Sequence, residues 1–336
     1  RYTALKNIHF PGSFAKLAEA KKRFIFEELF LLQCGLLYYR DRIKEVRQGI
    51  KHGVDGKLVT AVKNSLPFEL TEAQQKAWQE ISLDMQDNKP MHRLLQGDVG
   101  SGKTVVSALA LAKTVENGYQ GCIMVPTEIL AQQHFETLTE YLGKQGLRVE
   151  LLTSSVKKAK RREILENLEL GEIDVLVGTH ALIQDDVVFA RLALVVTDEQ
   201  HRFGVKQREK LYQKGKEPHV LAMSATPIPR TLALILYGDM DLSVIDERPA
   251  NRLPIKNCTV NTDYRPNAYR FMLKQIEEGR QVYIICPMVE QDDESELESV
   301  MLYTEELKSQ FPPSVTIEYL HGKMKPAQKE DIMARY

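Results

Sequence analysis

Three short segments of the chain carry side chains suited to phosphate chemistry, and the first is Gly97-Asp98-Val99-Gly100-Ser101-Gly102-Lys103-Thr104. In such a loop, glycines let backbone N–H groups converge on phosphate oxygens, the lysine reaches the β/γ-phosphates and the threonine hydroxyl meets Mg²⁺. We expect a short buried strand at 93–96 before the loop and a helix at 104–117 after it, whose N-terminus adds partial positive charge. This context favours a nucleoside triphosphate site over a glycine-rich turn with an exposed lysine.

The second segment, Asp198-Glu199-Gln200-His201, follows the apolar run 192–196, which is typical of a strand buried on both faces. Asp198 is predicted to hold Mg²⁺, usually through water, and Glu199 to polarise an attacking water. The alternative is that Asp198 caps a following helix or turn. With the third segment, Ser224-Ala225-Thr226, the pattern predicts hydrolysis of a nucleoside triphosphate.

Composition is that of an ordinary globular enzyme. The chain has 336 residues, enough for about two domains, with 43% hydrophobic and 27% charged residues. The formal net charge is −1, so any contact with DNA must come from a local basic face or from backbone amides. No run approaches the roughly 18 apolar residues of a membrane helix, and no signal peptide is evident. We expect a soluble cytoplasmic protein without a membrane partner.

The spacing of the cysteines argues against disulfides and against a thiolate metal site. Cys34, Cys122, Cys258 and Cys286 are scattered, each in an apolar setting, without the spacing of metal ligands. We therefore predict four buried thiols in a reducing compartment, and no metal other than Mg²⁺.

Strand-like and helix-like segments divide the chain into three regions. Residues 1–60 read as a helical arm, with a long helix or helical pair over 13–48. In 61–254 strands and helices alternate, which predicts an α/β domain with a parallel sheet, helices on both faces, and ligands at the carboxyl ends of the strands. In 255–336 the pattern restarts, with strands expected at 282–285 and 315–319 and helices at 297–308 and from 326. This second α/β unit is expected to continue beyond Tyr336.

The chain resembles the superfamily 2 helicases, and more narrowly the RecG branch-migration helicases. The wider resemblance lies in Gly97–Thr104, Pro126–Glu128, Gly178–His180, Asp198–Gly204 and Ser224–Thr231. The narrower one lies in Asp198–Val205, Ala225–Leu232, Tyr237–Glu247 and the opening His9-Phe10-Pro11 before the helical arm. The transcription-repair coupling factors share several of these elements but usually have a second glutamate where this chain has Gln200.

The resemblance implies a RecA-like P-loop ATPase domain that is preceded by the arm and followed by a truncated second RecA-like lobe. It implies an ATP- and Mg²⁺-dependent DNA helicase that remodels stalled forks and Holliday junctions. Branched double-stranded DNA would be the substrate and single-strand-binding protein a further partner, for a monomer in the bacterial cytoplasm, at the nucleoid. The family's N-terminal wedge domain would lie before Arg1. The arginines that complete its ATP site would lie beyond Tyr336. The alternatives are a coupling-factor translocase and, for this chain alone, a nucleotide-gated DNA-binding fragment.

The resemblance also assigns roles near the nucleotide. Gln74 resembles the glutamine that reads adenine, although Thr71 and Gln74 also fit a capping box at a helix start. Gln200 and His201 would sense the γ-phosphate. Ser224 and Thr226 would link the nucleotide site to DNA, or would only satisfy backbone groups of a turn.

On the DNA side, Pro126, Thr127, Thr179 and His180 follow strands on the face where this superfamily grips a phosphate backbone, and Arg230 follows the third segment. Hydroxyl, backbone N–H and cationic groups suit sequence-independent binding. For His180 an ordinary hydrogen-bonded histidine is the alternative, and for Arg230 a structural ion pair.

Overall fold

The computed structural model describes residues 1–46, 48–225, 240–247, 255–287 and 299–336. The chain divides into two compact units, Arg1–Arg252 and Leu253–Tyr336. Thr226 and Arg230, two of the predicted functional residues, lie outside the described ranges. Within those ranges, no helix combines the length and the apolar character that crossing a membrane requires.

A seven-stranded sheet forms the centre of the first unit, and every pairing within it is parallel. Its strand order is β3-β4-β2-β5-β6-β1-β7. The strands are β1 His92–Gly97, β2 Gln120–Met124, β3 Val149–Leu152, β4 Val175–Gly178, β5 Leu192–Thr197, β6 His219–Ser224 and β7 Asp241–Ile245. The predicted parallel sheet is confirmed, and the expected strands at 93–96 and 192–196 coincide with β1 and β5 within one residue at each end.

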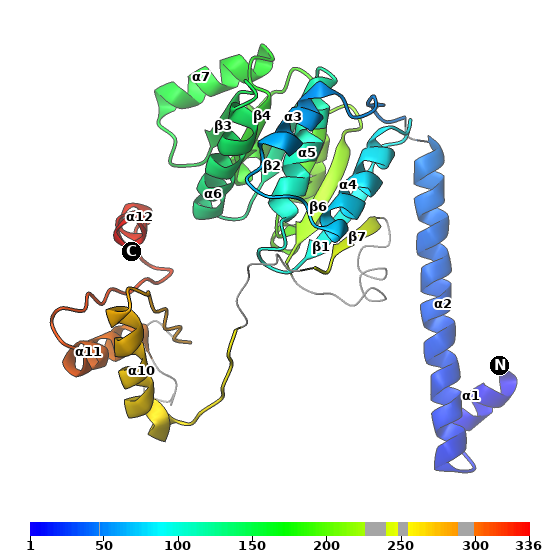
Figure 1. Ribbon diagram of the computed structural model, residues 1–336. Helices are drawn as coiled ribbons and strands as arrows, with labels where there is room; N and C mark the ends of the chain where they lie inside the picture. Colours follow the sequence, from blue (N-terminus) through cyan, green and yellow to red (C-terminus); the bar gives the residue numbers. More distant parts are fainter. Residues whose placement is uncertain (47, 226–239, 248–254, 288–298) are drawn as a thin grey trace. The chain divides into compact units, whose positions relative to one another are not determined.

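Helices cover both faces of this sheet, because alternate residues of each central strand point to opposite sides. In β2, Ile123 belongs to one buried cluster, whereas Cys122 and Met124 belong to another. The helices of the first unit are α1 Tyr2–His9, α2 Phe14–Val46, α3 Lys57–Ser65, α4 Glu72–Met85, α5 Lys103–Glu116, α6 Glu128–Leu138, α7 Lys158–Glu169 and α8 Val205–Tyr212. The side chains of α3, α4, α5 and α6 join the cluster of Ile123, and those of α7 and α8 join that of Cys122. Figure 1 shows α3 and α5 lying over the sheet.

Of the two possibilities expected over 13–48, a long helix or a helical pair, the structure has a single helix, α2. The prediction of four buried cysteines is wrong in part: Cys122 is buried, but Cys34 and Cys258 are exposed and Cys286 is half-buried. Apolar neighbours in sequence do not bury a side chain on an exposed helix face such as that of α2.

The second unit contains α10 Arg265–Glu277, α11 Val300–Gln310 and α12 Pro326–Arg335. Tyr269, Leu307 and Phe311 form its small core. The strands expected at 282–285 and 315–319 are not formed in the part of this unit that the structure describes. A strand requires a hydrogen-bonded neighbour, and an apolar run of sequence does not supply one.

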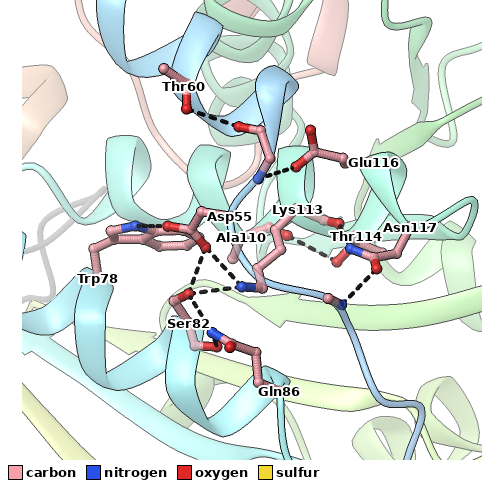
Figure 2. A network of polar contacts seen from close by, with 12 residues as sticks. Asp55, Thr60, Trp78, Ser82, Gln86, Ala110, Lys113, Thr114, Glu116 and Asn117 are labelled. Atoms are coloured by element: carbon pink, nitrogen blue, oxygen red, sulfur yellow. Dashed lines mark hydrogen bonds and ion pairs between the residues drawn. The ribbon is translucent and has the colours of Figure 1, made fainter.

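The segment that leads from α2 into α3, residues 49–58, is fastened to α4 and α5, and we call it the strap. The backbone N–H groups of Gly56 and Leu58 donate to the Glu116 carboxylate at 2.9 and 2.6 Å, and that of Gly53 donates to Asn117 Oδ1 at 2.7 Å. Glu116 and Asn117 lie at the C-terminal end of α5. Figure 2 shows the strap meeting this end of α5.

Asp55 of the strap meets a buried ammonium group (Figure 2). Its carboxylate accepts from Lys113 Nζ at 2.7 Å, from Ser82 Oγ at 2.6 Å and from Trp78 Nε1 at 3.0 Å. Burial raises the pKa of Asp55, but these hydrogen bonds and the charge of Lys113 lower it more, so its pKa lies below the ordinary value. Lys113 is fully buried, so loss of Asp55 would leave an unpaired charge in the core.

Two buried histidines close the other end of the strap. Met91 N–H donates to His219 Nδ1 at 2.9 Å, so the proton of this ring is on Nε2, which lies 2.7 Å from Ile50 O. The ring centroids of His52 and His219 are 4.9 Å apart. Burial lowers the pKa of His52 to about 4 and that of His219 to about 3. Both rings are therefore neutral in the folded protein near neutral pH.

We predict that the free energy of unfolding falls as the pH drops from about 6.5 towards 4. In the unfolded chain each imidazole takes up a proton near its ordinary pKa of 6.5, and the folded protein excludes that proton. Each ring changes the free energy of unfolding by up to about 1.4 kcal/mol per pH unit in this range. Urea unfolding at several pH values should show a flatter profile for His219→Gln and an unchanged one for His180→Gln, a change at an exposed histidine. An equally steep profile in His219→Gln would contradict this assignment.

Candidate nucleotide-binding site

The glycine-rich segment forms a tight loop between β1 and α5. Gly100 and Gly102 have φ angles of 76° and 90°, which side-chain-bearing residues rarely adopt. A Cβ at Gly102 would also collide with Gln74 Nε2, and one at Gly97 would collide with Ser101 Oγ. The loop therefore requires glycine for its backbone angles at 100 and 102, and for space at 97 and 102.

Lys103, the first residue of α5, folds back over this loop. Its Nζ donates to the carbonyl oxygens of Gly97 at 2.7 Å and Asp98 at 2.9 Å. Burial lowers the pKa of the Lys103 ammonium, while the charges of Asp198 and Glu199, and then that of Asp98, act to raise it. The predicted acid pair is thus close enough to the lysine for its electric field to act on it.

The acid pair lies at the carboxyl end of β5, directly after Thr197. Asp198 N–H donates to Met124 O at 3.0 Å, and Glu199 N–H donates to Asp198 Oδ1 at 3.0 Å. Glu199 has left-handed backbone angles, φ 52° and ψ 50°. For a residue other than glycine this conformation costs on the order of 1–3 kcal/mol and is concentrated at functional sites. The alternative role for Asp198, the cap of a following helix or turn, also stays open, because its Oδ1 accepts from the N–H of Glu199, which precedes the 3₁₀ turn Gln200–Arg202.

Ser224 ends β6, the strand between β5 and β1, and pairs in register with Gln96 of β1. The described parts of the three predicted segments therefore lie at the carboxyl ends of three adjacent strands, β5, β6 and β1. Ser224 is buried. Gln200 and His201 are the first two residues of the 3₁₀ turn Gln200–Arg202, which follows the acid pair.

Buried polar atoms lacking a protein partner are concentrated at this edge. Among the described residues, no hydrogen bond is made by Ser101 Oγ, Thr197 Oγ1, Thr179 Oγ1 or Gln200 Oε1. Since buried polar groups in proteins are nearly always hydrogen-bonded, these atoms indicate a place that binds a polar ligand or water. Oxygen ligands such as the Asp198 carboxylate and the Thr104 hydroxyl suit Mg²⁺, which usually keeps several waters and needs few protein ligands. The residues present therefore fit a magnesium nucleotide.

Gln74 ties the start of α4 to the loop. Its Oε1 accepts from Thr71 N–H at 3.0 Å, its own N–H donates to Thr71 Oγ1 at 3.3 Å, and its Nε2 donates to Ser101 O at 2.7 Å. The capping box that the sequence offered as an alternative is confirmed. Recognition of adenine by the same side chain stays a prediction.

The predicted DNA-contact residues follow two neighbouring strands, β2 and β4. Thr127 is exposed and caps α6, accepting from Leu130 N–H at 3.3 Å, and Pro126 beside it is half-buried. After β4, Thr179 is buried and His180 is exposed. Their role in DNA binding stays a prediction.

The sequence analysis missed His134, whose Nε2 lies 2.8 Å from Asp198 Oδ2. It also missed Glu247, which follows β7 and accepts from Ala73 N–H of α4 at 3.1 Å. The available signal for the contact of His134 with Asp198 was the position of this histidine on the apolar helix face that also carries Ala131 and Leu138. Only the fold reveals that this face meets the end of β5.

Comparison with known proteins identifies the class to which this fold and site belong. The DEAD/DEAH box helicase family matches residues 71–235, the region that contains β1 to β6 and the loop. The structure of Mss116p bound to single-stranded RNA and AMP-PNP shares the fold, with a TM-score of 0.59 at 18% identity over 84% of this chain and 61% of its own. The chain thus has the fold of these helicases.

Within the helicases, the relatives with high sequence identity to this chain are RecG proteins. The ATP-dependent DNA helicases RecG of Bacillus subtilis and Thermotoga maritima are 47% and 44% identical over 335 and 333 residues, which is 100% and 99% of this chain. A RecG solved in complex with a three-way DNA junction superposes with a TM-score of 0.81 at 40% identity, over 99% of this chain and 43% of its own. The whole of this chain is therefore similar to part of the RecG helicases. It spans about half the length of the curated relatives that it matches, 49% and 43% for the two named.

We predict that Gly102→Ala weakens both the fold and nucleotide binding more than Gly146→Ala does. Both positions have a positive φ, so each alanine costs about 1–2 kcal/mol of backbone strain. Only at Gly102 does the new Cβ displace Gln74 Nε2 from Ser101, because nothing lies within 4 Å of a Cβ at Gly146. The lost hydrogen bond adds about 1 kcal/mol. Urea unfolding and titration with a fluorescent ATP analogue measure both effects, and equal losses in the two variants would contradict the geometry.

Proposed function

We propose that this protein is an ATP-dependent DNA helicase that remodels branched DNA, such as stalled forks and Holliday junctions. The observation that carries the proposal is geometric: the loop with Lys103 follows β1 and the paired acids Asp198 and Glu199 follow β5, so both lie at one edge of the sheet with only β6 between their strands. A triphosphate on the loop would lie between a cation and a metal-binding carboxylate, as phosphoryl transfer requires. The similarity of the whole of this chain to RecG helicases supports branched DNA as the substrate.

The nucleotide would be held chiefly by the loop. Backbone N–H groups of Gly97–Gly102 and the N-terminus of α5 would bind the phosphates. Lys103 would release the carbonyls of Gly97 and Asp98 and neutralise β/γ-phosphate charge. Thr104 and Asp198 would hold Mg²⁺, which on binding supplies positive charge to the phosphate oxygens. Gln74 is proposed to read the adenine edge while it keeps its contact with the loop.

Glu199 would orient and polarise the attacking water. Its left-handed backbone is a strained conformation of the kind that is concentrated at functional sites. Gln200 and His201, in the turn that follows, are proposed to sense the γ-phosphate. Ser224, at the end of the strand between the acids and the loop, and Thr226 are proposed to relay that state to DNA.

DNA would be bound by residues that follow β2 and β4 and by Arg230. Pro126, Thr127, Thr179 and His180 offer backbone, hydroxyl and imidazole groups suited to a phosphate backbone without base readout. Single-strand-binding protein is proposed as a further partner, the protein as a monomer, and the bacterial cytoplasm, at the nucleoid, as its location. The coupling-factor alternative is not favoured, because the relatives that match the whole chain are RecG helicases.

The test is ATP hydrolysis by the complete protein with forked DNA, with linear duplex and without DNA. We expect forked DNA to stimulate turnover most, and Lys103→Ala to abolish turnover and junction unwinding while junction binding is kept. Equal rates with and without DNA would favour a nucleotide-gated DNA-binding protein. Unwinding at the wild-type rate by Lys103→Ala would end the helicase assignment.

A second prediction concerns Glu199→Gln. The amide keeps the shape of the side chain but cannot act as a base, so we expect ATP to bind and turnover to fall by about 10²-fold or more. Rapid filtration with labelled ATP should recover bound, unhydrolysed nucleotide. Normal turnover in this variant would remove Glu199 from the mechanism.

A further inference from the structure

A histidine outside the predicted segments touches the proposed magnesium ligand. His134 lies on α6, and its Nε2 is 2.8 Å from Oδ2 of Asp198, 64 residues further along the chain. The two side chains are 8% and 14% exposed, so little water competes for the contact. It joins α6 to the end of β5.

Both oxygens of the Asp198 carboxylate are thereby held. Oδ1 accepts from Glu199 N–H at 3.0 Å and Oδ2 contacts His134, while the backbone N–H of Asp198 is bonded to Met124 O. A carboxylate offers about four lone-pair positions, so two protein bonds leave room for a metal-bound water. Two bonds on different oxygens also fix the plane of the group.

For His134, the bond to Asp198 is the side-chain hydrogen bond that orients the ring. Its Nδ1 is buried and, among the residues that the structure describes, has no hydrogen-bond partner. An ionised carboxylate can only accept, so Nε2 carries the proton. A buried imidazole with an unsatisfied nitrogen is costlier than an apolar side chain of similar size, which argues against a role as core filling alone.

We propose that His134 is a positioning residue, which holds the Asp198 carboxylate in the orientation that a magnesium nucleotide needs. The proposal rests on the proposed function, because it takes Asp198 as the metal ligand. Groups that hydrogen-bond a metal-ligating carboxylate orient it, and their loss typically weakens metal binding by 10- to 100-fold. His134 extends the site from three strand ends to helix α6.

The test compares His134→Gln with His134→Met in the complete protein. Glutamine places an N–H near the position of Nε2, whereas methionine has similar length and no donor. With an ATP analogue bound, Mn²⁺ affinity measured by electron paramagnetic resonance should fall about 10-fold or more in the methionine variant and stay within about 3-fold in the glutamine variant. Affinity for the metal-free analogue should be unchanged in both.

Gln133→Met, an exposed neighbour on α6, is the control and should match the wild type. Melting temperatures are measured first, and if the methionine variant does not fold, His134→Asn, whose shorter side chain cannot reach Oδ2, replaces it. Equal Mn²⁺ affinity in the glutamine variant and in the methionine variant or its asparagine replacement, or a matching loss of metal-free nucleotide binding, overturns the inference. If the wild type fails to hydrolyse ATP on DNA, the proposed function fails instead, whatever the Mn²⁺ titrations give.

Discussion

The site depends on one constraint, which is that a lysine and two carboxylates following different strands must come to the same edge of the sheet. Lys103 follows β1, and Asp198 and Glu199 follow β5, with β6 between these strands. Burial lowers the pKa of the ammonium and the acids act to raise it. Parallel strands end at the same edge, so this fold brings the opposite charges together without any contact in sequence.

The loop helix is anchored at both of its ends. At the start of α5, Gln74 bonds Ser101 of the loop at 2.7 Å, and at the far end Glu116 and Asn117 bind the strap. Lys113, about one turn earlier, is fully buried and donates to Asp55 of the strap. A helix fixed in this way places the phosphate-binding N–H groups before any ligand arrives, and such preorganisation makes electrostatic stabilisation effective.

Much of the fold and the loop could be predicted because they depend on local pattern. The apolar run 192–196 marks a strand buried on both faces, and Gly100 and Gly102 mark backbone angles that glycine adopts most readily. The contact of His134 with Asp198 and the strap could not be predicted, because each joins segments that only the folded chain brings together. The strands expected at 282–285 and 315–319 show the converse, since apolar composition alone does not make a strand without a hydrogen-bonding neighbour.

The most direct measurement is a crystal structure of the complete protein with Mg²⁺ and a non-hydrolysable ATP analogue. The account predicts that the β- and γ-phosphates lie on the loop from Gly97 to Thr104, with Lys103 turned from the carbonyls to the phosphates. The metal should face Asp198 and the Thr104 hydroxyl. A triphosphate bound elsewhere, or an Asp198 carboxylate directed away from the metal, would contradict it.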